Sequence, residues 1–346
     1  MTFLDEMKTA VTPRAALLVI GTLVLQLLFI ASYVGALHNP RPKDVPFGVV
    51  APAQAGTRLV GELKGLPGGP LDPRTVADAA DARQKILNRD LDGALIVRPG
   101  GSKDTLLVAS GGGTVLSSSL DRIITGVEKT QRRSVRTVDV APASAQDFDG
   151  LSAFYLVVGW CVGGYLCASI LAISAGSRAA NGRRAALRLI TMALYSVLGG
   201  LGGAVIVGPV LGALPGSVLG LWGLGALVVF GVGAITLALQ ALTGIVGIGL
   251  AVLLVVVAGN PSAGGAFPLP MLPPFWHAIG PWLPPGAGTW TARSIAYFGG
   301  NSVTGPLLVL SGWAVVGTVI TLSMSTLRRR PAVAPEPRET PRAPRA

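Results

Sequence analysis

Side chains that could perform acid–base, nucleophilic or metal chemistry are nearly absent from the second half of this 346-residue sequence. Between Leu151 and Leu327 there is no Asp, Glu or Lys. Ion-coupled carriers commonly place carboxylates inside the membrane, and a protease needs a nucleophile with a base or a set of metal ligands. We therefore expect no enzyme active site here, no metal site and no cofactor.

Three further groups of residues carry weak chemical signals. Cys161 and Cys167 lie in one apolar stretch without a metal or redox motif, so we interpret them as small apolar side chains. His38 and His277 lie at or beyond the ends of apolar stretches, and an interfacial polar role for His277 is favoured over a ligand role. The glycine run 111–113 is followed by no Lys, and no phosphate-loop motif occurs, so it predicts a tight turn before a helix.

Arginines gather in two short segments beside apolar stretches, and these segments hold most of the net charge of +11. The tail from Arg328 carries six basic residues against two acidic ones. The segment 175–188 carries four basic residues and no acid: Arg178, Arg183, Arg184 and Arg188. This is the positive-inside pattern of membrane topology, whereas a nucleic-acid-binding surface would be a basic patch on a folded domain. We expect no nucleic-acid partner.

The composition predicts an α-helical polytopic membrane protein. Half of the residues are apolar, only 13% are charged, and the mean hydropathy is +0.59. The first apolar stretch, 15–37, is long enough to cross a core of ~30 Å at roughly 1.5 Å per residue. A cleaved signal peptide ending near Val34–Ala36 is the alternative, but the apolar region is long and more spans follow, so a retained anchor is favoured.

The apolar block 151–327 predicts a five-helix membrane domain, which gives about six membrane-spanning helices in total. The stretch 217–258 is too long for one crossing, and we place the break between its two helices near Gln240–Gly244. The remaining predicted spans are 152–174, 187–211 and 305–327. Six spans put both termini on one side, and the arginine-rich segments make that side the cytoplasm.

Residues 38–150 predict a small α/β domain on the other, extracytoplasmic side of the membrane. Apolar runs bounded by Gly and Pro predict strands, and longer runs with a helical apolar stripe predict helices. The expected strands are 45–50, 93–97, 105–110 and 135–140, and the expected helices are 72–90 and 114–133. The N-terminal segment 1–14 and the disordered basic tail 328–346 are expected in the cytoplasm, where the tail can contact anionic lipids.

The most distinctive stretch of the membrane block is 260–301, which is rich in Pro and Trp. Proline blocks a continuous helix and Trp prefers the membrane interface, so this stretch predicts a broken helical hairpin at the outer leaflet. A plain interfacial loop and a functional gate both fit it. As a gate, its candidate residues are Pro273, Pro274, Trp276, Pro284, Pro285, Gly286 and Arg293.

The order of these elements resembles the membrane subunits of ABC-2 type exporters, in particular the YhgE/Pip-like (phage infection protein) branch. The external domain carries the best local match, from Asp81–Ile86 through Asp90–Val97 to the strand Thr105–Ser110. The Pro-rich runs Leu272–Trp276 and Leu283–Gly286 are similar to the segment before the last span of these permeases.

The resemblance implies a permease in the cytoplasmic membrane of a bacterium, working as a homodimer or as a heterodimer with a related permease. A separate ATPase would bind the N-terminal segment and the segment 175–188, whose four arginines either fix the topology only or also couple to that ATPase. An apolar bundle without carboxylates fits a lipid-like or amphipathic cargo. The alternative is a non-transporting membrane protein whose external domain binds a cell-envelope partner or a phage.

Overall fold

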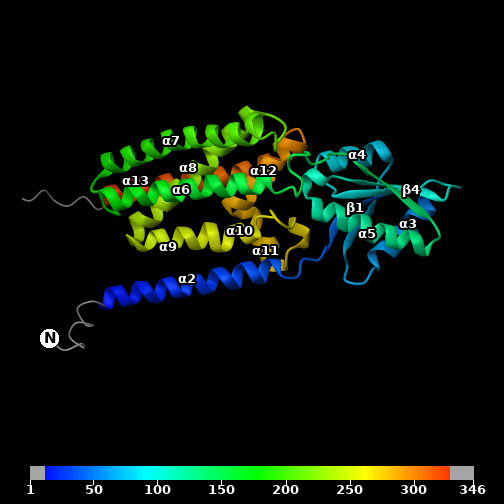
Figure 1. Ribbon diagram of the computed structural model, residues 1–346, viewed down its shortest axis with the longest axis horizontal. Helices are drawn as coiled ribbons and strands as arrows, with labels where there is room; N and C mark the ends of the chain where they lie inside the picture. Colours follow the sequence, from blue (N-terminus) through cyan, green and yellow to red (C-terminus); the bar gives the residue numbers. More distant parts are fainter. Residues whose placement is uncertain (1–11, 328–346) are drawn as a thin grey trace, which may run out of the picture.

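The computed structural model describes residues 12–327, which form a bundle of helices with an α/β domain at one end (Figure 1). Within these residues, five helices are long and apolar enough to cross a membrane. They are α2 (Pro13–Leu37), α6 (Ser152–Ala175), α7 (Gly182–Val205, continued by the π-helical turn Ile206–Val210), α8 (Val218–Thr243) and α13 (Thr304–Leu327). The chain is thus a multi-pass membrane protein by the length and composition of its helices.

The described residues contain five long apolar helices, and the expected sixth span is a shorter apolar helical run, so the predicted count of about six spans is matched only in part. The break after α8 lies at Gly244, which has a left-handed φ of 72° and lies where the sequence placed it. The following run consists of α9 (Val246–Val252), a π-helical stretch (Leu253–Gly259) and α10 (Asn260–Ser262). Its 17 residues cover about 26 Å, less than a core of ~30 Å, because the chain turns away near Gly264 at a φ of 69°.

The centre of the bundle is α8, which packs against α6, α7 and α13. Small residues allow these backbones to approach closely. A Cβ added at Gly200 of α7 would lie 2.5 Å from the backbone nitrogen of Ala226 in α8. The outer faces of the helices carry exposed Leu, Ile and Val side chains, as expected of surfaces that face lipid.

The α/β domain lies between α2 and α6 in the chain. Its five strands have the order β2-β1-β3-β4-β5, and only the β3–β4 pair is antiparallel. Its elements are β1 (Val45–Val50), α3 (Ala53–Lys64), β2 (Leu71–Thr75), α4 (Ala79–Leu87), β3 (Gly93–Ile96), β4 (Lys103–Val108), a 3-10 turn (Ser110–Gly112), α5 (Thr114–Thr130) and β5 (Ser134–Asp139). The α/β class, the four predicted strands and the turn before α5 are therefore confirmed.

Two elements of this domain were not predicted, α3 and β2. The expected helix 72–90 begins later, as α4, because β2 takes its first residues. Pro73 argues against a strand in the sequence, but β2 is at the edge of the sheet, where a missing backbone donor is tolerated. The side chain of Asp78 then caps α4 by accepting a hydrogen bond from the backbone N–H of Asp81 at 2.8 Å.

The sheet is oriented so that the amino-terminal end of β1 lies next to the helical bundle. The backbone N–H groups of Arg41 and Lys43, just before β1, donate to the carbonyls of Met271 and Pro270 in the membrane domain at 3.3 and 2.9 Å. The carboxyl ends of β1, β2 and β3 therefore lie at the end of the sheet that is far from the bundle (Figure 1).

Candidate functional site

The Pro- and Trp-rich segment folds as a series of short helices, as the sequence predicted for a broken hairpin. They are α11 (Pro274–Ile279), a 3-10 turn (Gly280–Trp282) and α12 (Pro284–Tyr297). Pro273 precedes α11 and Pro274 is its first residue, whereas Pro284 and Pro285 open α12; proline fits these positions because the first helical N–H groups need no partner within the helix. Trp276, in α11, is partly buried and its ring contacts Phe275 edge to face.

Close contact between backbones holds this series together. A Cβ added at Gly286 would overlap the carbonyl oxygen of Gly280, and one added at Gly280 would overlap the carbonyl oxygen of Ser262. The end of α10, the 3-10 turn and the start of α12 are therefore stacked backbone on backbone. The helix α12 itself is mostly buried and packs against α6, α8 and α13.

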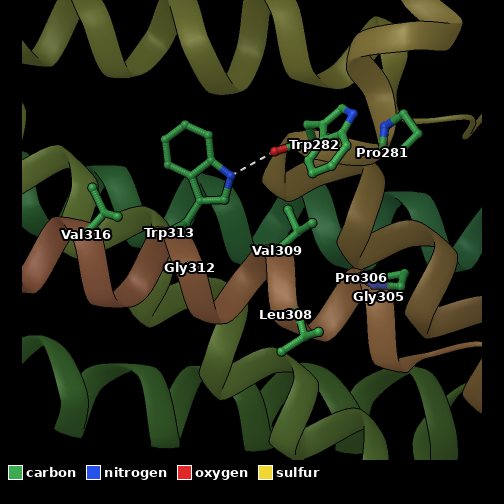
Figure 2. A pocket seen from close by; sticks show the side chains of 9 residues that line it. All are labelled: Pro281, Trp282, Gly305, Pro306, Leu308, Val309, Gly312, Trp313 and Val316. Carbon is green, nitrogen blue, oxygen red and sulfur yellow. Dashed lines mark hydrogen bonds between the residues drawn. The ribbon is translucent and has the colours of Figure 1, made fainter.

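An apolar groove lies between this series and α13 (Figure 2). Its volume is about 850 Å³, and it is lined by Pro281 and Trp282 on one side and by one face of α13 on the other. The α13 residues that line it are Gly305, Pro306, Leu308, Val309, Gly312, Trp313 and Val316. The indole N–H of Trp313 donates to the carbonyl of Trp282 at 2.8 Å, which ties the two walls together.

The groove opens to the outer surface of the bundle, where lipid would lie. The side chains of Trp282 and Leu308 are 68% and 67% exposed. Because the lining is almost entirely carbon, the groove can hold an acyl chain or a similar apolar group, but it offers no partner for a charged one.

Arg293 was a candidate gate residue, but it does not line the groove. Its side chain is 4% exposed and donates to three backbone carbonyls, those of Gly264 at 2.7 Å, Gly265 at 2.7 Å and Gly150 at 3.0 Å. Gly150 precedes α6, so the guanidinium joins α12 to two other segments. Beside it, the Tyr297 hydroxyl donates to the carboxylate of Asp147 at 2.8 Å. The structure therefore assigns Arg293 to the interior packing of this region.

A second arginine, Arg89 of the α/β domain, reaches the same helix, although no sequence pattern predicts this contact. Its guanidinium donates to the carbonyl of Trp290 at 2.8 Å and to the hydroxyl of Ser294 at 2.7 Å, and it lies 3.3 Å from the centre of the Trp290 ring. Burial, with a further contribution from Arg293, lowers the pKa of Arg89 to about 9. Arg89 therefore remains protonated at neutral pH and couples the α/β domain to α12.

The end of the hairpin is also bound to the α/β domain. The Ser302 hydroxyl donates to the carbonyl of Asn88 at 2.6 Å, and the side-chain amide of Asn301 donates to the carbonyl of Leu87 at 3.1 Å. The glycine run before α5 completes this contact, since a Cβ added at Gly111 would lie 2.5 Å from the Tyr297 ring. The domain, α12 and the loop before α13 thus form one contact region.

The arginine-rich segment 175–188 is only partly a loop. The loop covers 176–181, and α7 begins at Gly182 with Asn181 as its cap, so Arg183, Arg184 and Arg188 belong to the first turns of a helix. Arg178, in the loop, is exposed, as are Arg183 and Arg184. These three form an exposed basic group at the end of the bundle opposite the α/β domain.

Arg188 does not belong to that exposed group, because its side chain is 9% exposed. It donates to the carbonyls of Ala175 and Gly176 at 2.9 and 2.7 Å and so satisfies the end of α6. The sequence could not separate this role from docking, since all four arginines occupy the same basic segment.

The remaining candidate residues, two cysteines and a histidine, form no further site within the described part of the chain. Cys161 and Cys167 are free thiols in α6, and His277 is exposed on α11. Within residues 12–327, no group of three or more His, Cys, Asp or Glu side chains is arranged to hold a metal ion. Comparison of the chain with protein-family models, with curated proteins and with solved structures found no match.

Proposed function

We propose that this chain is the membrane-spanning permease subunit of an ATP-driven exporter of the ABC-2 type. In this proposal it lies in the cytoplasmic membrane of a bacterium with both termini in the cytoplasm and the α/β domain outside. The short run Val246–Ser262 then crosses, or nearly crosses, the membrane as the sixth span. The cargo is a lipid-like or amphipathic compound, and the energy comes from a separate ATPase chain.

The apolar groove between Trp282 and α13 is the observation that carries this proposal. Its volume of about 850 Å³ falls in the usual range of ligand sites, and it is open toward lipid. An amphipathic compound can therefore leave its apolar part in the groove while its polar part stays at the membrane surface.

In this proposal the groove changes shape when its two walls move relative to each other. One of its walls, Pro281–Trp282, belongs to the 3-10 turn that precedes α12, whereas the other wall is a single long helix, α13. A displacement of the turn relative to α13 would open or close the groove. The exposed group Arg178, Arg183 and Arg184 lies at the other end of the bundle, where an ATPase with an acidic surface could move α7 and the helices packed on it.

The first prediction concerns the ATPase partner. We expect an ATPase to copurify with the tagged chain from gently solubilised native membranes, and we expect the Arg183→Glu/Arg184→Glu variant to lose it, because the reversed charges would repel an acidic surface. The measurement is the ATP hydrolysis activity and stoichiometry of the purified complex.

The matched control for this experiment reverses two exposed basic residues of the α/β domain, Arg83→Glu and Lys129→Glu. This variant should retain the ATPase. A wild-type preparation that contains only copies of this chain would contradict the exporter proposal, as would equal retention of the ATPase by both variants.

The second prediction concerns the groove. A phospholipid with a photoreactive acyl chain should label α13 peptides around Gly312 in the reconstituted wild-type chain, and Gly312→Phe should reduce that labelling at least threefold by filling the groove. Gly312 has no atom within 4 Å of an added Cβ, so the larger side chain fits the open space.

Gly223→Phe on the exposed face of α8 is the matched control, since Gly223 also has open space around it but lies outside the groove. Labelling around residue 312 should stay at the wild-type level in this variant. If both variants lose labelling equally, or neither does, the groove does not hold the acyl chain.

The alternative function, binding of a cell-envelope partner or phage by the α/β domain, is favoured by one separate observation. A polar crevice lies at the end of the sheet that is far from the bundle. Its chemistry is distinct from that of the apolar groove.

A further inference from the structure

The order of the strands creates a crevice at the carboxyl ends of β1 and β3, at the end of the sheet that is far from the bundle. From β1 the chain passes through α3 to β2 on one side, and from β2 it passes through α4 to β3 on the other side of β1. The connection that leaves β3 leads to β4, on the side away from β1, so the connections leaving β1 and β3 diverge between the carboxyl ends of these two neighbouring strands. In open α/β sheets, ligands bind outside the carboxyl ends of the strands at such a switch point.

A cavity of about 580 Å³ lies at this place. Ala51 and Val97, the residues that follow β1 and β3, line it, together with Arg58 and Glu62 of α3. The cavity extends over the beginning of β4 and the end of α5. It is separate from the groove of the membrane domain, and its lining is about as polar as it is apolar.

The floor of the crevice carries a buried ionic cluster. Asp104 is 1% exposed and accepts two hydrogen bonds from Arg133, both at 2.6 Å. Arg133 also donates to the carbonyls of Gly101 at 2.7 Å and Arg98 at 3.3 Å. Its guanidinium is therefore already supplied with acceptors, and it has little capacity left for an anionic ligand.

One acceptor in this cluster, a carboxyl oxygen of Glu128, has no donor while the group is ionised, whereas the protonated group is hydrogen-bonded to Asp104. Glu128 is 1% exposed, and its Oε2 accepts no hydrogen bond within the described part of the chain. The nearest cation, Nε of Arg133, is 3.6 Å away and donates its proton to Asp104. A buried carboxylate oxygen without a donor is destabilising, so a donor from outside would be bound favourably at this oxygen.

The rim of the crevice is ionic but internally paired. Glu62 accepts hydrogen bonds from Nε of Arg58 at 2.8 Å and from the side-chain amide of Gln131 at 3.0 Å. An anion entering the crevice would meet the carboxylates of Glu62, Asp104 and Glu128 while both arginines are engaged. A divalent metal is not favoured either, because no three carboxylate, His or Cys groups of residues 12–327 are arranged to hold one.

We propose that this crevice binds a small ligand carrying a protonated amine, which donates a hydrogen bond to Oε2 of Glu128. The ammonium group would lie over the floor of the crevice, and the remainder of the ligand would extend between α3 and the loop after β3. The α/β domain would thus be a receptor for a cationic small molecule, whether or not the membrane domain transports one.

The charge of Glu128 makes binding dependent on pH. Burial, a hydrogen bond between the protonated carboxyl group and Asp104, and the charge of Asp104 raise the pKa of Glu128 to about 7, whereas Arg133 lowers it. Arg58 and Glu62 line the same crevice from α3. A carboxyl group with such a pKa goes from about one-tenth to about nine-tenths ionised between pH 6 and pH 8. Because the ionised form attracts the ammonium group, the affinity should rise roughly tenfold over this interval.

Calorimetric titration of the full chain in detergent tests the proposal with three probes of similar length: butane-1,4-diamine, butane-1,4-diol and succinate. At pH 8 the diamine should bind at least tenfold more tightly than the diol or succinate. Glu128→Gln should lose this preference. Asp90→Asn, which neutralises an exposed acid at the other end of the domain, should bind the diamine as the wild type does.

A second variant guards against effects of the buried cluster on folding. Ala55→Trp adds a large side chain at an exposed position of the rim and leaves the cluster intact, so it should reduce diamine binding by obstructing entry. Equal affinities for the three probes, or unchanged diamine binding in both Glu128→Gln and Ala55→Trp, would overturn the proposal. Neither result depends on an ATPase, so this test fails or succeeds independently of the exporter proposal.

Discussion

Replacing Arg293 by Leu is expected to lower the free energy of unfolding by more than about 3 kcal/mol. The substitution leaves the carbonyls of Gly150, Gly264 and Gly265 without their donor in the interior, and each unpaired buried group costs about 1–3 kcal/mol. The measurement is denaturant or thermal unfolding of the detergent-purified chain.

Two comparison variants separate this loss from a general effect of removing an arginine. Arg183→Leu, at an exposed position, should change stability by less than about 0.5 kcal/mol. Arg293→Lys should fall in between, because an ammonium group cannot reproduce the planar arrangement of guanidinium donors. If Arg293→Leu unfolds like the wild type, the three carbonyls have other partners and α12 is not held as described.

Gly286→Ala is expected to have the second largest effect, a destabilisation of about 2–3 kcal/mol, with increased proteolysis near the turn 280–282. The added methyl group would overlap the carbonyl oxygen of Gly280, which is backbone and cannot rotate away, so α12 must shift. Since the same turn carries Trp282, the displacement should also alter the groove. Thermal unfolding and limited proteolysis of the purified chain measure both effects.

The same glycine-to-alanine substitution at Gly312 should not destabilise the protein, in contrast to Gly286→Ala. Gly312 lies in the middle of α13 with open space around its Cα, so alanine should leave stability unchanged or raise it by up to about 1 kcal/mol. Equal destabilisation by the two substitutions would mean that the close contact at Gly286 is not the cause.

These two predictions concern α12, the helix that joins the membrane domain to the α/β domain. Arg293 holds α12 to the membrane domain, and Arg89 holds the same helix to the α/β domain. Movement of α12 would therefore change contacts in both the membrane domain and the α/β domain. A ligand in the far crevice and a cargo in the groove would occupy different sites of a molecule that is joined through this helix.

The amino-acid sequence was sufficient for the elements whose signal is local. Long apolar stretches identified the five long helices, because a helix that faces lipid must be apolar over its whole length. The central strands β1, β3 and β4 were found for a similar reason, since both faces of a central strand are covered. The edge strand β5 is largely exposed, and its Val residues, which favour strands, identified it. The edge strand β2 was missed because a partly exposed edge strand needs few apolar residues, and its Asp, Pro and Arg residues are typical of a loop.

The roles of the arginines were decided only by the tertiary structure. Arg188 and Arg293 stand in segments that predict coupling or gating, yet both are buried and bind backbone carbonyls. The Arg293 partner at Gly150 is 143 residues away in the chain, and the Arg89 partner Ser294 is 205 residues away. Sequence patterns report the environment of a residue through its neighbours in the chain, whereas a hydrogen-bond partner is set by how distant segments pack.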